Sequence, residues 1–183
     1  MGESLMTVVA IFVAAILMFV FPLMAVSERN DDITQLAVQT AVVEFIDKVS
    51  STGKITASDY DGLSQTLGAT GNSYDVELEA KILDENPGKK VTWTEGTKIG
   101  ENVYYSQYTS QITDYFDLDI SKDKYDGKQT YYLKEGDIIS VNVKNTNQTL
   151  SQLLRNFFYK VTGQDSYQVS AEHAKMVTVK GKR

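Results

Sequence analysis

The sequence predicts an α+β fold: an N-terminal transmembrane helix continues into an amphipathic helix, followed by a small, mostly antiparallel sheet covered by helices. Three observations predict it. Residues 5–26 contain no charge, residues 31–49 repeat apolar side chains at helical spacing, and residues 73–83 alternate apolar and polar side chains. These patterns divide the 183 residues into an anchor at 1–27 and one domain at 28–183.

The uncharged run Leu5–Val26 is long enough to cross a membrane. At ~1.5 Å per residue, a helix of this length matches a typical hydrocarbon core. Thr7 can return its hydroxyl bond to a carbonyl one turn back, and Pro22 should bend the helix. A cleaved signal peptide is the alternative, because Ala25-Val26-Ser27 has small residues at the spacing of a peptidase site. The length of the run favours the anchor, since signal peptides have shorter apolar regions.

Charges beside the span indicate its orientation. Arg29 is the only basic residue in the twenty that follow the span, and none precedes it. Because cytoplasmic flanks usually carry the basic excess, we expect a single-pass protein whose large domain lies outside the cytoplasm.

An amphipathic helix over about 28–52 is expected to have two apolar faces. The broad face contains Val38, Ala41, Val42, Phe45, Ile46 and Val49. Ile33, Leu36 and Val43 fall on nearly the opposite side at ~100° per residue. This second face suits either contact with another protein or burial within a small domain.

The junction between the span and this helix allows two arrangements. Ser27 and Asn30 can cap a new helix, or they can lie inside a continuous one. A continuous helix would run from about Leu5 to Ser50 and would join the anchor rigidly to the core of the domain.

Shorter patterns predict the first half of the domain. Gly53 should end the long helix, and Thr56–Asp59 offers caps for a short second helix. Alternation over Ser73–Leu83 predicts a half-solvated strand, and a shorter strand is expected at 91–93. Aromatic residues at helical spacing predict a helix over Glu101–Phe116.

The second half should contain strands at 130–133 and 137–144. A capping box at Thr149–Gln152 opens an amphipathic helix. Its apolar residues are Leu150, Leu153, Leu154, Phe157, Phe158 and Val161. Alternation over Tyr167–Val179 places polar residues on the inward side, which predicts a bulge or a strand that leaves the core.

Composition excludes several classes of function. The formal net charge is −6, and an acidic domain repels phosphate backbones, so nucleic acid is not expected as a partner. The chain has no cysteine and one histidine, which excludes disulfides, thiol nucleophiles and multi-histidine metal sites. His173 has Glu172 beside it, but neighbours on a strand point to opposite faces. Motifs such as G-x-S-x-G and H-E-x-x-H are missing, so we expect no enzyme, no cofactor and no small-molecule substrate.

A polar loop after the aromatic segment partly matches a calcium-binding pattern. Asp117 and Asp119 occupy its first and third positions, but Lys122 replaces the required glycine and Lys128 the final glutamate. The carboxylates that could still gather around Ca²⁺ are Asp117, Asp119, Asp123 and Asp126. The failed pattern favours a solvated loop, so no metal site is expected.

The layout resembles pilin-like proteins, in which an N-terminal hydrophobic helix anchors the subunit and continues into a small α+β head. A closer resemblance is to the TadE-like minor pilins, or pseudopilins, of tight-adherence (Flp) pilus systems in Gram-positive bacteria. The resemblance is carried by Val38–Val49, Thr52–Thr56 with Tyr60, Gly71–Val76, Gly136–Val143 and Tyr167–Val179. It implies a structural protein of the bacterial cell membrane, without catalytic residues, whose partners are pilus or secretion-system subunits, further copies of itself included.

Gly2-Glu3 resembles a prepilin cleavage site, although the fifth residue after the cut is Thr7 and not the usual glutamate. Cleavage after Gly2, cleavage after Ser27 and an uncleaved anchor all stay open. The alternative function is a membrane-anchored or secreted extracellular binding or sensing domain. For assembly, the candidate residues are Leu5, Ala10, Ala14, Ala15, Pro22, Ile33, Leu36 and Val43, since small residues let helices approach closely in lipid.

Overall fold

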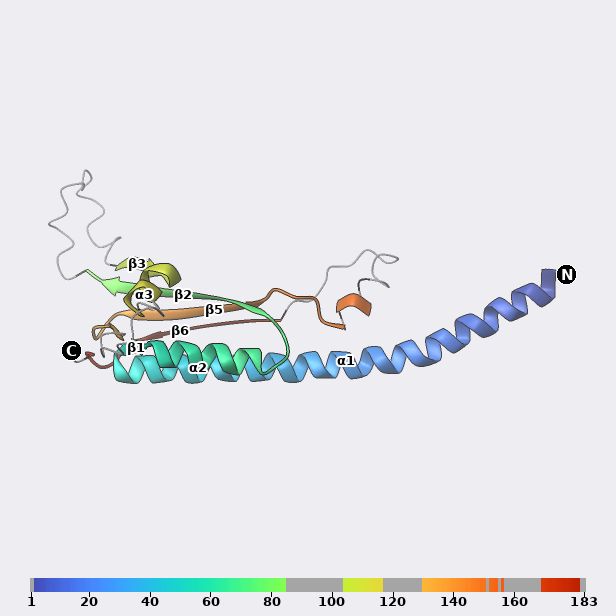
Figure 1. The fold of residues 1–183 in the computed structure, drawn as a ribbon, viewed down its shortest axis with the longest axis horizontal. Coiled ribbons are helices and arrows are strands. Elements are labelled where there is room, and N and C mark those ends of the chain that lie inside the picture. The colour runs from blue at the N-terminus through green and yellow to red at the C-terminus, as the bar shows by residue number, and fades with distance from the viewer. Residues whose placement is uncertain are drawn as a thin grey trace, which may run out of the picture.

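The computed structural model describes residues 2–84, 104–116, 130–150, 152–154, 156 and 169–181. It confirms the α+β prediction: a long N-terminal apolar helix is followed by a small antiparallel sheet with helices. Figure 1 shows the head gathered along one end of the long helix, while the other end extends away from it.

The long helix α1 is continuous over Gly2–Thr52 and spans ~76 Å at ~1.5 Å per residue. Ser27 and Asn30 therefore lie inside one helix and cap nothing. As expected, the hydroxyl of Thr7 donates to the carbonyl of Glu3 at 2.9 Å. Pro22 lies within α1, and the N-terminal half of the helix curves (Figure 1).

Among the described residues, α1 is the one helix long and apolar enough to cross a membrane, and its most apolar stretch is not buried. This lack of burial separates the apolar stretch from the buried core helix of a soluble protein. An N-terminal signal sequence can meet the same criteria of length and hydropathy, so the choice between anchor and signal still rests on the length argument from the sequence.

The main sheet contains β2 (Tyr74–Leu83), β3 (Tyr104–Tyr108), β5 (Ile138–Asn145) and β6 (Ser170–Met176). Its strand order is β3-β2-β5-β6, and every neighbouring pair is antiparallel. A second pair joins β1 (Lys54–Thr56) to β4 (Thr130–Tyr132). The alternation predicted for β2 and β5 is confirmed, because Leu78, Ala80, Ile139 and Val141 are buried on one face.

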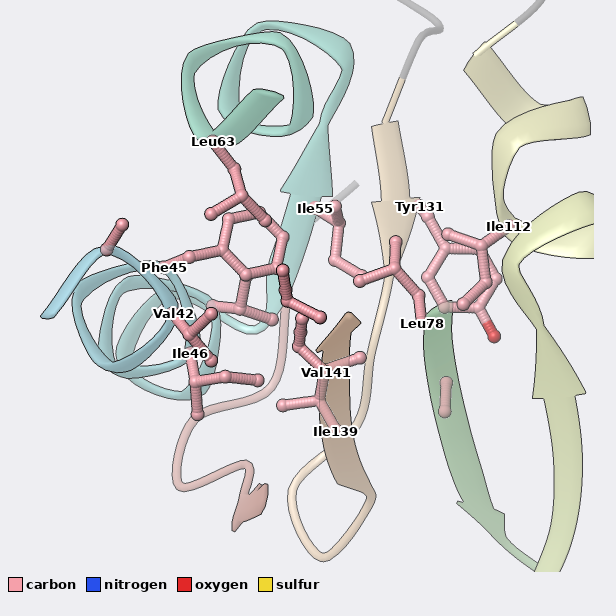
Figure 2. Packing of buried hydrophobic residues seen from close by; sticks show 14 of the residues in the cluster. Val42, Phe45, Ile46, Ile55, Leu63, Leu78, Ile112, Tyr131, Ile139 and Val141 are labelled. Atoms are coloured by element: carbon pink, nitrogen blue, oxygen red, sulfur yellow. The ribbon is translucent and has the colours of Figure 1, made fainter. Parts of the chain in front are cut away.

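Helices cover this apolar face. Helix α2 (Ala57–Gly68) starts with the predicted capping box between Thr56 and Asp59 and lies beside α1 (Figure 1). Burial raises the pKa of Asp59, but hydrogen bonds from Lys48 and Thr56 outweigh that effect, and the net pKa falls below its ordinary 3.8. Figure 2 shows the core where α1, α2, β1 and the sheet meet, with Val42, Phe45, Ile46, Ile55, Leu63, Leu78, Ile139 and Val141.

The edge of β6 is closed by α1. The side-chain amide of Gln35 donates to the carbonyl of Ser170 at 2.7 Å and accepts from its N–H at 3.2 Å. Further along the strand, the Ser50 hydroxyl donates to the carbonyl of Met176 at 2.7 Å. Because these bonds occupy backbone groups of an edge strand, α1 limits pairing of this edge with another chain.

In the described part, the helix predicted over Glu101–Phe116 is wrong at Tyr104–Tyr108 and is confirmed only in part beyond it. Tyr104–Tyr108 forms β3, followed by the short helix α3 (Thr109–Thr113) and the 3₁₀ turn η3 (Asp114–Phe116). Tyrosine favours strands as much as it fits a helical stripe, and pairing with β2 decides the outcome.

Of the two alternatives for the last strand, the bulge is absent, since β5 and β6 pair without interruption from Lys144 to Ile138. The strand instead leaves the core, because its inward residues go from buried Ala171 to exposed Lys175. The inward polar residue Lys175 instead meets Asp47 of α1, with 2.7 Å between Nζ and Oδ1. The strand predicted at 91–93 lies outside the described residues.

Candidate assembly surface

Helix α1 has one face that holds the head. Its buried apolar residues, spaced three and four apart, are Val38, Ala41, Val42, Phe45, Ile46 and Val49. The sequence predicted this set in full, because the apolar repeat is uninterrupted.

The opposite face of α1 is exposed. Ile33 and Leu36 are 60% and 65% exposed, and Val43 is 38% exposed. Burial of this face in the domain, one of the two interpretations left open by the sequence, is therefore wrong. The physical reason is that α2 and the sheet both pack on the other side of α1 (Figure 1).

The exposed face continues toward the N-terminus. Seven-residue steps back from Ile33 lead to Val26, Phe19 and Phe12, all of them exposed. Thr40 lies between Leu36 and Val43, and its hydroxyl donates to the Leu36 carbonyl at 2.9 Å, so this polar group needs no other partner. We call Phe12, Phe19, Val26, Ile33, Leu36, Thr40 and Val43 the outer stripe. Arg29 is the one charged residue of this face between Val26 and Ile33.

The remaining candidates lie in the apolar half of α1. Ala10 and Ala14 are exposed one turn apart, a spacing that bares the helix backbone for close approach. Ala15 and Pro22 are exposed on the face of the outer stripe, and Leu5 is exposed near the N-terminal end. Because α1 is continuous, all the candidate residues lie on a single helix. The sequence had left open whether the helix breaks after the apolar run.

A polar contact beside the span was not predicted. Ser27, Asp31 and Thr34 are buried on the same side of α1 as the core residues. The Thr149 hydroxyl donates to Oδ2 of Asp31 at 2.9 Å. The sequence contained a signal for this contact. Asp31, Thr34 and Val38 are spaced three and four residues apart, which continues the buried face of α1 upstream.

The candidate metal and catalytic residues give no site in the described part of the chain. Asp117, Asp119, Asp123 and Asp126 lie outside it, and no group of acidic or histidine residues within it could hold a metal ion. His173 lies opposite Val141 in the sheet register. A hydrogen bond from Lys175 lowers the pKa of Asp47, with the charges of Lys175 and His173 acting in the same direction, so this cluster joins β6 to α1.

A polar groove of about 510 Å³ lies on the outer face of the sheet. Glu77, Glu79 and Glu172 contribute carboxylates to its lining. Two of them are held by neighbours: Ser106 donates to Glu79 at 2.7 Å, and Asn142 donates to Glu77 at 3.1 Å.

No family model, curated protein or solved structure matches this chain. The surfaces described above therefore rest on the geometry of this molecule alone.

Proposed function

We propose that the chain is a non-enzymatic, single-span protein of the bacterial cell membrane that serves as a structural subunit of an envelope assembly. The resemblance to TadE-like pseudopilins suggests a pilus or a secretion system, with the head outside the cytoplasm. The observation that carries the proposal is the outer stripe, an apolar face of α1 that points away from the head.

The energetics favour contact between subunits along this stripe. Fully burying an isoleucine or leucine side chain contributes about 1.5–3 kcal/mol, and Ile33 and Leu36 keep most of their surface in contact with solvent. Copies anchored in one bilayer already share a parallel orientation and a high local concentration, which reduces the entropic cost of association. Within the lipid, Ala10 and Ala14 would permit close helix packing.

Cysteine cross-linking gives a direct test, because the chain has no cysteine of its own. We expect Leu36→Cys in native membranes to form covalent adducts with a short bifunctional maleimide. The matched control is Gln65→Cys, which is exposed on α2 in the head and not on α1. Equal yields from the two variants, or no adduct from either, would contradict assembly through the stripe.

A charge test addresses assembly itself. The double variant Ile33→Asp/Leu36→Asp should keep its thermal midpoint and lose higher-order complexes on native electrophoresis of membrane extracts. Ser64→Asp/Gln65→Asp places the same two charges at exposed polar positions of α2 and should assemble normally. If the first variant assembles as the parent does, the outer stripe has no part in assembly.

The groove on the sheet favours a second candidate, an anchored extracytoplasmic binding domain. Its carboxylates and Tyr108 suit a cationic ligand such as a lysine-containing peptide. Calorimetric titration with a short oligolysine peptide tests this: binding that weakens in Glu172→Gln supports it, and the absence of heat rejects it.

A further inference from the structure

The first turn of helix after β5 carries its polar and apolar residues in an unusual arrangement. Residues 150, 152–154 and 156 are helical. The predicted capping box is present: the Thr149 N–H donates to Oε1 of Gln152 at 3.1 Å, and the Gln152 N–H donates to Oγ1 of Thr149 at 3.3 Å. We call Thr149, Leu150, Gln152 and Leu153 the cap turn.

In the cap turn the polar side chains are buried and the leucines are exposed. Thr149 and Gln152 are buried, whereas Leu150 and Leu153 are each 51% exposed. A helix in a water-soluble domain turns its apolar side toward the core, so this arrangement is reversed. An apolar environment outside the head would explain it.

The cap turn is fixed close to the end of the apolar run. Thr149 donates to Asp31 at 2.9 Å, and Asp31 lies five residues beyond Val26, the last residue of that run. Along α1 this separation is ~7.5 Å at ~1.5 Å per residue. The headgroup region on each side of the hydrocarbon core is about 5–8 Å thick. In Figure 1 the turn (orange) lies beside the middle of α1, away from α2.

We propose that the cap turn is a second membrane contact, in which Leu150 and Leu153 enter the interfacial layer of the same bilayer that holds α1. The inference rests on the proposed membrane anchoring. The two leucines would contact the boundary between headgroups and acyl chains, which accepts apolar side chains of short amphipathic helices. Two contacts, α1 and the cap turn, restrict the tilt of the head relative to the bilayer, because tilting α1 would lift the cap turn out of the interfacial layer or push it deeper.

The test uses the full chain in neutral phosphatidylcholine vesicles. A fluorescent label on Leu153→Cys reports its depth through quenching by lipids with a nitroxide at the headgroup or the upper acyl chain. Labels on Val26→Cys and Ser51→Cys serve as references, because Val26 ends the apolar run and Ser51 is exposed ~37 Å further along α1 at ~1.5 Å per residue.

We expect quenching of the Leu153 label at least half as strong as that of the Val26 label, with little quenching at Ser51. A Leu153 label quenched no more than the Ser51 label overturns the inference. So does a Leu153 label that is shielded from aqueous iodide but not quenched by the lipids, since another protein copy would then cover it. Failure of the anchoring itself is distinguishable, because the Val26 label would then escape lipid quenching as well.

Discussion

Gly53 follows the end of α1, and the variant Gly53→Ala tests how closely the C-terminal segment packs against it. Its backbone has φ +66°, and its carbonyl accepts from the N–H of Leu133 at 2.8 Å. A Cβ at this position would overlap the carbonyl oxygen of Val179 and lie 2.5 Å from the nitrogen of Gly181. Gly53→Ala therefore has to move the C-terminal segment or the end of the long helix.

Gly71 provides the matched control. Its φ of +81° is equally unfavourable for alanine, but a Cβ there would meet nothing within 4 Å. A left-handed conformation costs a residue other than glycine ~1–2 kcal/mol, and forcing extra atoms into a packed site costs a further ~1–3 kcal/mol. We expect Gly71→Ala to lower the free energy of unfolding by ~1–2 kcal/mol and Gly53→Ala by ~2–5 kcal/mol.

The measurement is urea unfolding of the full chain in detergent, followed by near-ultraviolet circular dichroism, which reports the packing of the head and not the helicity of α1. The difference between the two losses of stability measures how closely Val179 and Gly181 pack against Gly53, because nothing comparable lies beside Gly71. Equal losses of stability in both would mean that this contact is not close-packed, and the reasoning would be refuted.

Three further predictions concern the core, an ion pair and the cap turn. Ile46→Ala should lower the free energy of unfolding by ~2–5 kcal/mol, because Ile46 is fully buried. Ile33→Ala should change it by less than ~0.5 kcal/mol, because Ile33 is exposed. Similar losses of stability in urea unfolding would contradict the assignment of a buried and an exposed face to α1. Since the pKa of Asp59 is lower in the folded state, its stabilising effect is complete above its ordinary pKa of 3.8 and is lost as the pH falls through the folded-state pKa. Asp59→Asn should therefore lose less stability than the parent between pH 5 and 2 in thermal unfolding. If the variant and the parent lose the same stability in acid, the Lys48–Asp59 pair does not cause that loss. Thr149→Ala removes the N-cap and the bond to α1, so stability should fall by ~0.5–2 kcal/mol, and hydrogen exchange of the Gln152 amide should accelerate; an unchanged exchange rate would show that the cap is not formed in solution.

The sequence was sufficient for elements whose signal is local and periodic. The apolar repeat from Val38 to Val49 predicted the buried face of α1, and alternation predicted β2 and β5. The two capping boxes, at Thr56 and Thr149, were also predicted, because each needs only two side chains three residues apart.

Tertiary structure decided the features for which the local sequence allows two conformations or environments of similar free energy. The segment Tyr104–Tyr108 fits a helical stripe and a strand equally well, and only the available edge of β2 made it a strand. Whether Ile33 and Leu36 are core or surface depends on where α2 and the sheet pack, which the helix alone does not specify. The burial of Asp31 depends on Thr149, 118 residues away. By itself the sequence determined a long apolar segment, an amphipathic helix and a set of strands, since periodicity encodes which side of an element is apolar. Only the fold determined which apolar side stays uncovered, because that depends on how many neighbours the rest of the chain can place around one helix.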